Sequence, residues 1–223
     1  MPPGELSSIT GIEPQQRHPH RVSIFVDGAF VLGVDGAVAA SLGLAVGQPI
    51  GEGRLREVAG AEEIRRAMDR ALQFLSYRAR SRAEVRRRLA RKGYEEEIID
   101  QVIDRLTQGG LIDDSQFTEA WVRARSTGRA MGPRRIAWEL RRKGVDAETV
   151  RDAVGRIDEA TELGLALKVG RQKAESMRGE PMPVARRKVA AALQRRGFSW
   201  DVTARVLEMI LAPGEEEESG PSD

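Results

Sequence analysis

The sequence predicts a mainly α-helical protein in which three similar three-helix units follow a short β module. The pattern Leu-x-basic-basic-Gly occurs at residues 89–93, 140–144 and 193–197, and its glycines are 51 and 53 residues apart. Apolar residues recur in the same frame before and after each copy, as expected for tandem structural repeats. Near the start of the chain, an Asp-Gly pair joins two short runs of strand-forming residues. An elongated, curved array of units is therefore expected, rather than one large core.

The β module is expected at residues 8–54, after a disordered start at residues 1–7. Runs rich in β-branched and aromatic residues predict three short antiparallel strands, a hairpin or three-stranded sheet, at residues 9–13, 22–26 and 29–34. Asp27-Gly28 lies between the last two runs, and this dipeptide favours a tight hairpin turn. A short helix is expected at residues 38–44.

The helical repeats are expected to occupy most of the remaining chain. A linking helix from Leu55 or Ala61 to about Ala79 leads into the first unit, and the last residues form an acidic disordered tail. The expected bounds are 55–112 for the linking helix and repeat 1, 113–158 for repeat 2, 159–212 for repeat 3 and 213–223 for the tail. In each repeat an apolar helix comes first, at residues 71–76, 117–125 and 161–174.

The second helix of each repeat is expected to end at the repeated glycine. Glycine adopts the left-handed conformation that closes a helix, and an apolar contact between the C3 and C″ residues accompanies a Schellman ending. Leu89, Leu140 and Leu193 occupy C3, while Tyr94, Val145 and Phe198 occupy C″. The starts are marked by a Ser81-x-x-Glu84 capping box and by Pro at the first position in Gly132-Pro133 and Met182-Pro183. Asp146 and Ser199 are good N-caps for the third helices, and Glu95 is a poorer one.

The composition separates charge along the chain. Lys and Arg number 36 against 34 Asp and Glu, a net charge of +2. Residues 65–145 hold 20 basic against 11 acidic residues, whereas residues 1–64 hold 4 against 8. A basic middle suits a polyanion or an acidic protein surface, although solvated Arg faces are common on helical proteins. No apolar run approaches the ~20 residues of a membrane span, so a soluble, cytoplasmic protein is expected.

No group of residues predicts catalysis, a cofactor or a metal. The chain has no Cys, and its only histidines, His18 and His20, lie in a Pro-containing charged stretch typical of a loop. Asp113-Asp114 could form an acid pair or a metal site, but its position between a Gly-rich turn and an apolar helix is typical of helix caps. Carboxylates at residues 95–97 favour a helix start for the same electrostatic reason. A protein without enzymatic activity is expected.

Basic residues are the better candidates for function. The candidate partner-binding residues are Arg86, Arg87, Arg91, Lys92, Arg134, Arg135, Arg141, Arg142, Lys143, Arg186 and Arg187. The pair before each glycine also complements a helix C-terminus, which is a purely structural explanation. That explanation fails at the front of a helix, where positive charge is unfavourable, so Arg134, Arg135, Arg186 and Arg187 indicate a partner. Major-groove recognition is disfavoured, because the helices after each glycine begin with carboxylates.

The repeats also resemble a known family, the RecX recombinase regulators. The resemblance covers about residues 8–211 and rests on FLSYRARSRAEVRRRLARKGY, GGLIDDSQFTEAWVRARSTGRAMGPRRIAWELRRKGV and the β segment ITGIEP…RVSIFVDGAFVLGVD. Its most specific parts are residues 111–117 and 128–136, and the third repeat is more divergent.

The resemblance implies a non-enzymatic regulator. Such a protein binds the RecA–DNA filament groove, inhibits filament growth, ATP hydrolysis and strand exchange, and thereby modulates recombinational DNA repair and the SOS response. Weaker, salt-dependent binding of single- and double-stranded DNA, no membrane contact and a monomeric state are expected with it. The alternative is a general nucleic-acid-binding protein that acts without RecA.

Overall fold

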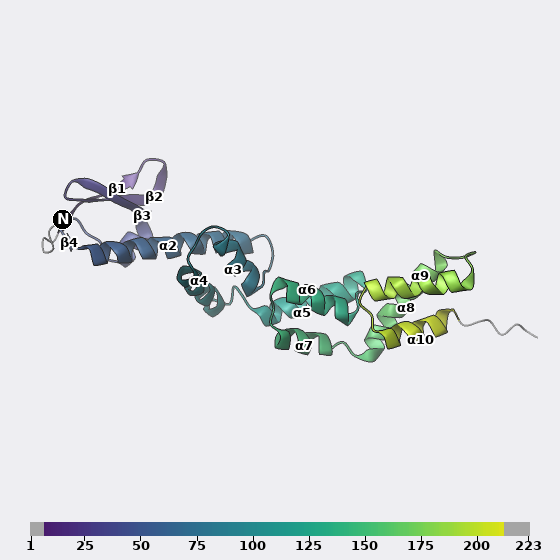
Figure 1. Ribbon diagram of the computed structural model, residues 1–223. Coiled ribbons are helices and arrows are strands. Elements are labelled where there is room, and N and C mark those ends of the chain that lie inside the picture. Colours follow the sequence, from purple (N-terminus) through teal and green to yellow (C-terminus); the bar gives the residue numbers. More distant parts are fainter. Residues whose placement is uncertain (1–6, 212–223) are drawn as a thin grey trace, which may run out of the picture. The chain divides into compact units, whose positions relative to one another are not determined.

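The computed structural model describes residues 7–211, and these residues form two compact units (Figure 1). The first unit holds residues 7–80 and 85–112, and the second holds residues 81–84 and 113–211. The expected disorder of residues 1–6 and of the tail at 213–223 lies outside the described residues. Ser7, which was expected to be disordered, is instead the first residue of a strand.

The β module is a four-stranded antiparallel sheet in the order β3-β2-β1-β4. Its strands are β1 (Ser7–Gln15), β2 (His18–Val26), β3 (Ala29–Asp35) and β4 (Pro49–Ile50). The expectation of three strands missed β4, because two residues that include a Pro carry no alternating pattern. The histidines lie exposed in β2 rather than in a loop. The Asp27-Gly28 turn is confirmed, with φ of 50° and 81°, the left-handed values that a type I′ turn requires.

Two helices complete the β module. The first, α1 (Gly36–Ser41), is capped by the Asp35 carboxylate, and the second, α2 (Glu52–Leu75), packs Val58 into the core of the sheet. The linking helix was expected to start at Leu55 or Ala61 and to end near Ala79, so it starts and ends earlier than predicted. Gly51 is its N-cap, and Gly53 lies in its first turn. The favourable packing of α2 outweighs the ~1 kcal/mol that a glycine inside a helix costs.

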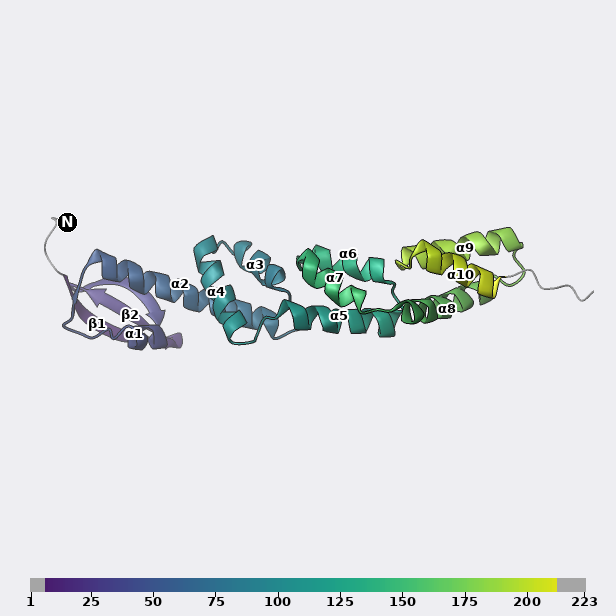
Figure 2. The same ribbon diagram turned by 90° about the horizontal axis from the view of Figure 1, so that it is seen from below.

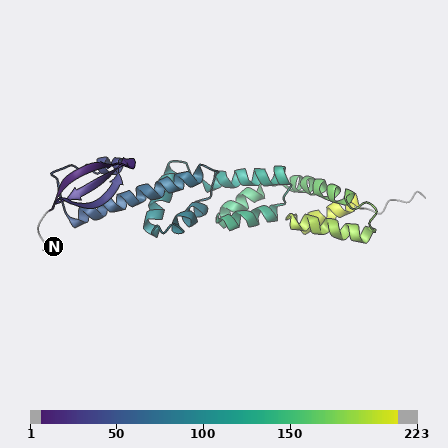
Figure 3. The same ribbon diagram turned by 90° about the horizontal axis from the view of Figure 1, so that it is seen from above.

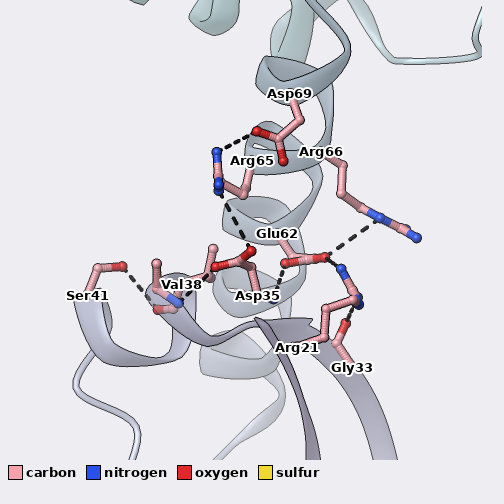
Figure 4. A network of polar contacts seen from close by, with 10 residues as sticks. Arg21, Gly33, Asp35, Val38, Ser41, Glu62, Arg65, Arg66 and Asp69 are labelled. Atoms are coloured by element: carbon pink, nitrogen blue, oxygen red, sulfur yellow. Dashed lines mark hydrogen bonds and ion pairs between the residues drawn. The ribbon is translucent and has the colours of Figure 1, made fainter. Parts of the chain in front are cut away.

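A buried carboxylate on α2 binds the end of the sheet (Figure 4). Glu62, only 5% exposed, accepts hydrogen bonds from Arg21 Nη1 at 2.5 Å and from the Asp35 backbone N–H at 2.7 Å. Arg21 also donates to the Gly33 carbonyl at 2.6 Å, and Arg66 lies 3.6 Å from the same carboxylate. Because a buried charge is stable only when it is paired and hydrogen-bonded, this network fixes β2 and β3 against α2.

Repeat 1 forms the remaining part of the first unit. The helices α3 (Arg82–Ala90) and α4 (Glu96–Gln108) pack with the second half of α2, and α3 contributes Val85 and Leu89 to their shared core. The first turn of α3 belongs to the second unit. The expected three-helix composition of the repeat is therefore confirmed, with the linking helix and the first repeat helix forming one continuous helix.

The second unit contains two further three-helix bundles, visible side by side in Figures 2 and 3. Repeat 2 consists of α5 (Asp114–Arg129), α6 (Pro133–Lys143) and α7 (Ala147–Gly155), around Phe117, Ile136 and Leu140. Repeat 3 consists of α8 (Glu159–Glu175), α9 (Met182–Arg195) and α10 (Trp200–Ile210), around Val189, Leu193 and Phe198. The mainly α-helical fold with three tandem three-helix repeats is confirmed.

The three glycine-terminated helices end in the predicted way. Gly93, Gly144 and Gly197 have φ of 86°, 84° and 84°. In each copy the N–H of the following apolar residue donates to the carbonyl of the repeated Leu, at 3.4, 3.3 and 3.3 Å, and the glycine N–H donates to the residue after that Leu. These paired bonds define a Schellman ending.

The helix starts also follow the sequence, with one difference. Ser81 and Glu84 form the reciprocal bonds of a capping box, and Asp146 and Ser199 accept N–H bonds as N-caps. The difference is in α9, which begins at Met182, so that Pro183 occupies its second helical position rather than the first.

Candidate functional site

An arginine-rich surface covers the exposed face of α6. Its residues, called the α6 surface below, are Arg134, Arg135, Trp138, Arg141 and Arg142. The helical period places them opposite the buried Ile136 and Leu140, because residues three, four and seven apart share a face. Trp138 is 43% exposed, so part of its ring is accessible to a partner.

Two guanidinium groups stack on the exposed indole. The Cζ atoms of Arg135 and Arg142 lie 4.4 and 4.6 Å from the centroid of the Trp138 ring. A guanidinium held over an aromatic ring is attracted by the ring face and is restricted in its motion. The indole therefore orders two forked donors that fit a phosphate or a carboxylate.

One side of the α6 surface is anchored to α5 through Glu139. The Glu139 carboxylate accepts bonds from Arg125 Nε at 2.7 Å and Trp121 Nε1 at 3.1 Å, and it lies 3.5 Å from Arg135 Nε. Burial raises the pKa of Glu139, but the Arg125 hydrogen bond and charge, helped by Trp121 and Arg135, lower it overall below its ordinary value. Glu139 therefore stays ionised at neutral pH and compensates part of the local positive charge.

Lys143 makes contacts within the protein rather than extending the α6 surface. Its ammonium lies 3.1 Å from Glu84 Oε1 and 4.2 Å from the centroid of the Trp121 ring, and its side chain is 16% exposed. Its predicted role in partner binding is thus not supported by exposure, because the charge already has a carboxylate and an aromatic face.

The other candidate residues lie on α3 and its glycine end, and on α9. In the first unit, Arg86 pairs with two carboxylates of α4, Arg91 donates from Nε to the carbonyl of Arg87 at 3.2 Å, and Lys92 is exposed beside Gly93. In repeat 3, two further arginines lie exposed on α9, at 186 and 187. On α6, the structure brings four candidate arginines together around one exposed tryptophan.

The tryptophan between these arginines was not among the candidate residues. A signal for Trp138 exists in the sequence, because it lies three or four residues from each of the four arginines and therefore shares their helical face. Its exposure depends on which face of α6 packs inward.

Two features are absent from the part of the chain that the structure describes: a cluster of metal-ligand side chains and a membrane-spanning helix. Residues 7–211 contain no group of three or more His, Asp or Glu side chains placed to hold a metal ion. Within the same residues, no helix is both long and apolar enough to cross a bilayer.

Family models match nearly the whole described chain. The N-terminal domain of regulatory protein RecX matches residues 7–51, and the first, second and third three-helix domains of RecX match residues 67–106, 113–154 and 160–207.

Individual relatives agree with the family models. The regulatory protein RecX of Clostridioides difficile (strain 630) is 30% identical over 206 residues, which cover 92% of this chain and 97% of that protein. The RecX of Mycobacterium sp. (strain JLS) is 40% identical over 151 residues, 66% of this chain and 81% of that protein.

Solved structures show the same fold. A crystal structure of regulatory protein RecX aligns with a TM-score of 0.75 at 28% identity, over 92% of this chain and 98% of that one. The crystal structure of RecX from Lactobacillus salivarius aligns with a TM-score of 0.63 at 25% identity, over 67% and 97%. Repeats, β module and relatives agree, and the chain belongs to the RecX family of regulatory proteins.

Proposed function

We propose that this protein regulates RecA without enzymatic activity of its own. In this proposal it binds RecA and the groove of the RecA–DNA filament, and it inhibits filament growth, ATP hydrolysis and strand exchange. It would thereby modulate recombinational DNA repair and the SOS response. Membership of a family of regulatory proteins supports the regulatory role. The observation that carries the proposal is the α6 surface, which presents ordered cationic donors around an exposed aromatic ring.

The α6 surface has the composition of an interaction hot spot. Trp and Arg are the residue types that most often dominate binding energy at protein interfaces. An ordered guanidinium loses less conformational entropy on binding than a freely moving one, so more of its interaction energy remains for affinity. Filament-bound DNA offers phosphates and a protein surface offers carboxylates, and both match forked donors.

The test compares two variants that lose the same charge. Arg141→Ala with Arg142→Ala removes two cations from the α6 surface, and Arg151→Ala with Arg171→Ala removes two exposed cations from α7 and α8. RecA's ATPase on single-stranded DNA is measured against inhibitor concentration. We expect the α6 variant to need about tenfold more protein or higher for half-inhibition, equivalent to about 1.4 kcal/mol. The control should stay within about twofold of the unchanged protein.

Two further measurements make the test decisive. Circular dichroism should show unchanged helicity in both variants, because the four substituted side chains are exposed. Trp138→Ala should weaken inhibition in the same direction, because it removes the ring on which two guanidinium groups are ordered. Equal inhibition by the α6 variants and the unchanged protein would remove the α6 surface from the proposal. Absence of inhibition by the unchanged protein at excess would refute the RecA role itself.

The second candidate function is nucleic-acid binding without RecA. It is favoured by the same ordered guanidinium groups, because phosphate fits them as well as carboxylate does. Binding to labelled single-stranded DNA should then fall steeply as salt rises from 50 to about 200 mM, since each phosphate contact releases counterions. Undetectable binding at low salt would exclude this function.

A further inference from the structure

Twice in the second unit, the start of one helix meets the glycine end of another. Here a glycine end means the repeated Gly and the residue before it: Lys92-Gly93, Lys143-Gly144 and Arg196-Gly197. At the Lys143 end, Ser81 Oγ donates to the Lys143 carbonyl at 2.7 Å, and Glu84 pairs with the Lys143 ammonium. The bonded carbonyl is one that the Schellman ending leaves without a partner in its own helix.

At the Arg196 end, the start of α6 makes the corresponding contact (Figure 2). Gly132 N–H donates to the Arg196 carbonyl at 2.8 Å, and Arg134 N–H donates to the Gly197 carbonyl at 3.1 Å. Ser81 and Gly132 occupy equivalent positions, each four residues before the first buried residue of the repeat frame.

Both contacts have the same physical cause. The last carbonyls of a helix and the first N–H groups of another are each left without partners in their own helix. At the Arg196 end, placing the two helix ends together satisfies both sets. At the Lys143 end, the Ser81 hydroxyl supplies the donor, and the carbonyl is the backbone group that gains a partner. Both contacts also set the positive end of one helix dipole against the negative end of the other. A glycine end is therefore a binding surface for a helix start, and this chain uses it in that way twice.

The third glycine end, Lys92-Gly93, has no such occupant. In residues 7–211, no hydrogen bond reaches the carbonyl of either residue. A Cβ added at Gly93 would meet nothing within 4 Å, whereas one at Gly197 would lie 2.3 Å from the backbone nitrogen of Arg135.

A hollow of about 700 Å³ lies at this free end. It is lined by α2 and by the helix-ending turn, through Glu63, Arg66, Asp69, Arg70, Gln73, Lys92, Gly93 and Tyr94. At the Arg196 end, Lys168 and Gln172 of α8 border the turn that leads into α6. In α2, Asp69 and Gln73 each come two residues after a buried alanine. In α8, Lys168 and Gln172 likewise each come two residues after a buried small residue. The hollow therefore lies where a helix start would contact the Lys92-Gly93 end, as the start of α6 contacts the Arg196-Gly197 end.

A second copy of this chain does not supply a matching helix start. Three helices, α3, α6 and α9, end at the repeated glycines. Of these, α9 is the one whose start meets no glycine end within the described residues. Its N-cap is Pro181, which has neither an N–H nor a hydroxyl to donate. Ala185 is the residue of α9 that corresponds to Ser81 and Gly132. It lies one turn inside the helix, where its N–H already donates to the Pro181 carbonyl at 3.0 Å. Because of this extra turn, the start of α9 has no donor at the position that Ser81 and Gly132 use to bind a glycine end.

We infer that the Lys92-Gly93 end of α3 is a docking site for the start of a helix on a different protein. The matching helix has Ser or Gly at its N-cap, which donates to the Lys92 carbonyl as Ser81 or Gly132 does within this chain. It also has a carboxylate three residues later, which pairs with Lys92 as Glu84 pairs with Lys143. This inference goes beyond the proposed regulation of RecA and does not depend on it.

The chain itself supplies a probe of this chemistry. A peptide of residues 80–91, held helical by a side-chain crosslink between positions 87 and 91, reproduces the Ser81 capping box. It is titrated into the full-length ¹⁵N-labelled protein and followed by NMR. We expect shifts at the amides of Lys92, Gly93 and Tyr94, with a dissociation constant below about 1 mM, the range for a small contact.

A charge exchange identifies the pair that holds the peptide. Lys92→Glu in the protein should weaken binding at least tenfold, and a peptide carrying Glu84→Lys should restore most of it on that variant. The control is Arg105→Glu, an equal charge change on exposed α4, which should leave binding within about twofold.

Three results would overturn the inference. The first is no shift at millimolar peptide, and the second is shifts confined to Lys143 and Val145, where the peptide would displace the chain's own helix start. The third is self-association of the full-length protein in sedimentation experiments that Lys92→Glu abolishes, because the occupant would then be a second copy.

Discussion

Replacing Gly132 by Ala tests the contact between repeats 2 and 3 with one methyl group. The backbone of Gly132 has φ −77° and ψ 161°, a conformation that alanine adopts freely. The added Cβ, however, would lie 2.5 Å from the carbonyl carbon and oxygen of Gly197 and from the Phe198 nitrogen. These are backbone atoms of a helix end, so they cannot rotate away and the two helix ends must separate.

The cost follows from the contacts that are lost. Overpacking of a close contact costs about 1–3 kcal/mol. Separation also weakens the bonds from Gly132 N–H and Arg134 N–H to the α9 end, each worth about 1 kcal/mol. Partial relaxation reduces the sum, and we expect a loss of about 2–4 kcal/mol in the free energy of unfolding of the second unit.

Tryptophan fluorescence measures this unit selectively, because Trp121, Trp138 and Trp200 all lie in it. Urea unfolding followed by fluorescence gives the free energy, and hydrogen exchange at the Arg134 amide reports the contact itself. The control is Gly128→Ala in α5, where an added Cβ meets nothing within 4 Å and should stabilise by about 0.5–1 kcal/mol. Unchanged stability and unchanged protection in Gly132→Ala would show that the two helix ends are not in close contact.

Three further predictions concern buried or half-buried carboxylates. Glu139→Gln should lower the unfolding free energy at pH 7 by about 1–3 kcal/mol. Because the pKa of Glu139 is lowered on folding, its contribution is present above its unfolded pKa and is lost as pH falls through the folded one. The variant and the unchanged protein should therefore converge in stability as urea titrations are repeated at progressively more acidic pH. Asp114→Asn should leave stability at pH 7 equal or raised, because burial raises the Asp114 pKa and an amide oxygen still accepts from Arg82 N–H; a clear loss by fluorescence would contradict this. Glu62→Ala should destabilise the first unit by about 2–4 kcal/mol, because Arg21 loses its buried partner, and hydrogen exchange in β2 and β3 should quicken while the tryptophan transition stays unchanged.

The accuracy of the sequence predictions depended on how local each feature is. The glycine-terminated helices, the capping box and the Asp27-Gly28 turn were predicted because each depends on residues only a few positions apart. The strand β4 was missed because it exists only through pairing with Ser7 and Ser8, which lie far from it in sequence. The start of α2 was placed too late for a similar reason, since packing against the sheet overrides the glycines in its first turns.

The same distinction applies to the candidate site. Charge segregation indicated the arginines of α6 from sequence alone. It could not separate Arg142, which stacks on an exposed ring, from Lys143, which pairs with a residue 59 positions earlier. Adjacent basic residues on a helix point in different directions, so only packing decides which of them meets solvent.

The repeat, its period and the way each repeated helix ends could be predicted from the residues, because a left-handed glycine and its neighbouring apolar pair act within one turn. The contacts that those helix ends make depend on how distant helices pack. The unpaired carbonyls of a Schellman ending can accept a further hydrogen bond, and at two of the three ends the donor comes from a helix start about 60 residues away. Two glycine ends therefore join helices within the chain, and the third, Lys92-Gly93, is exposed beside an open hollow.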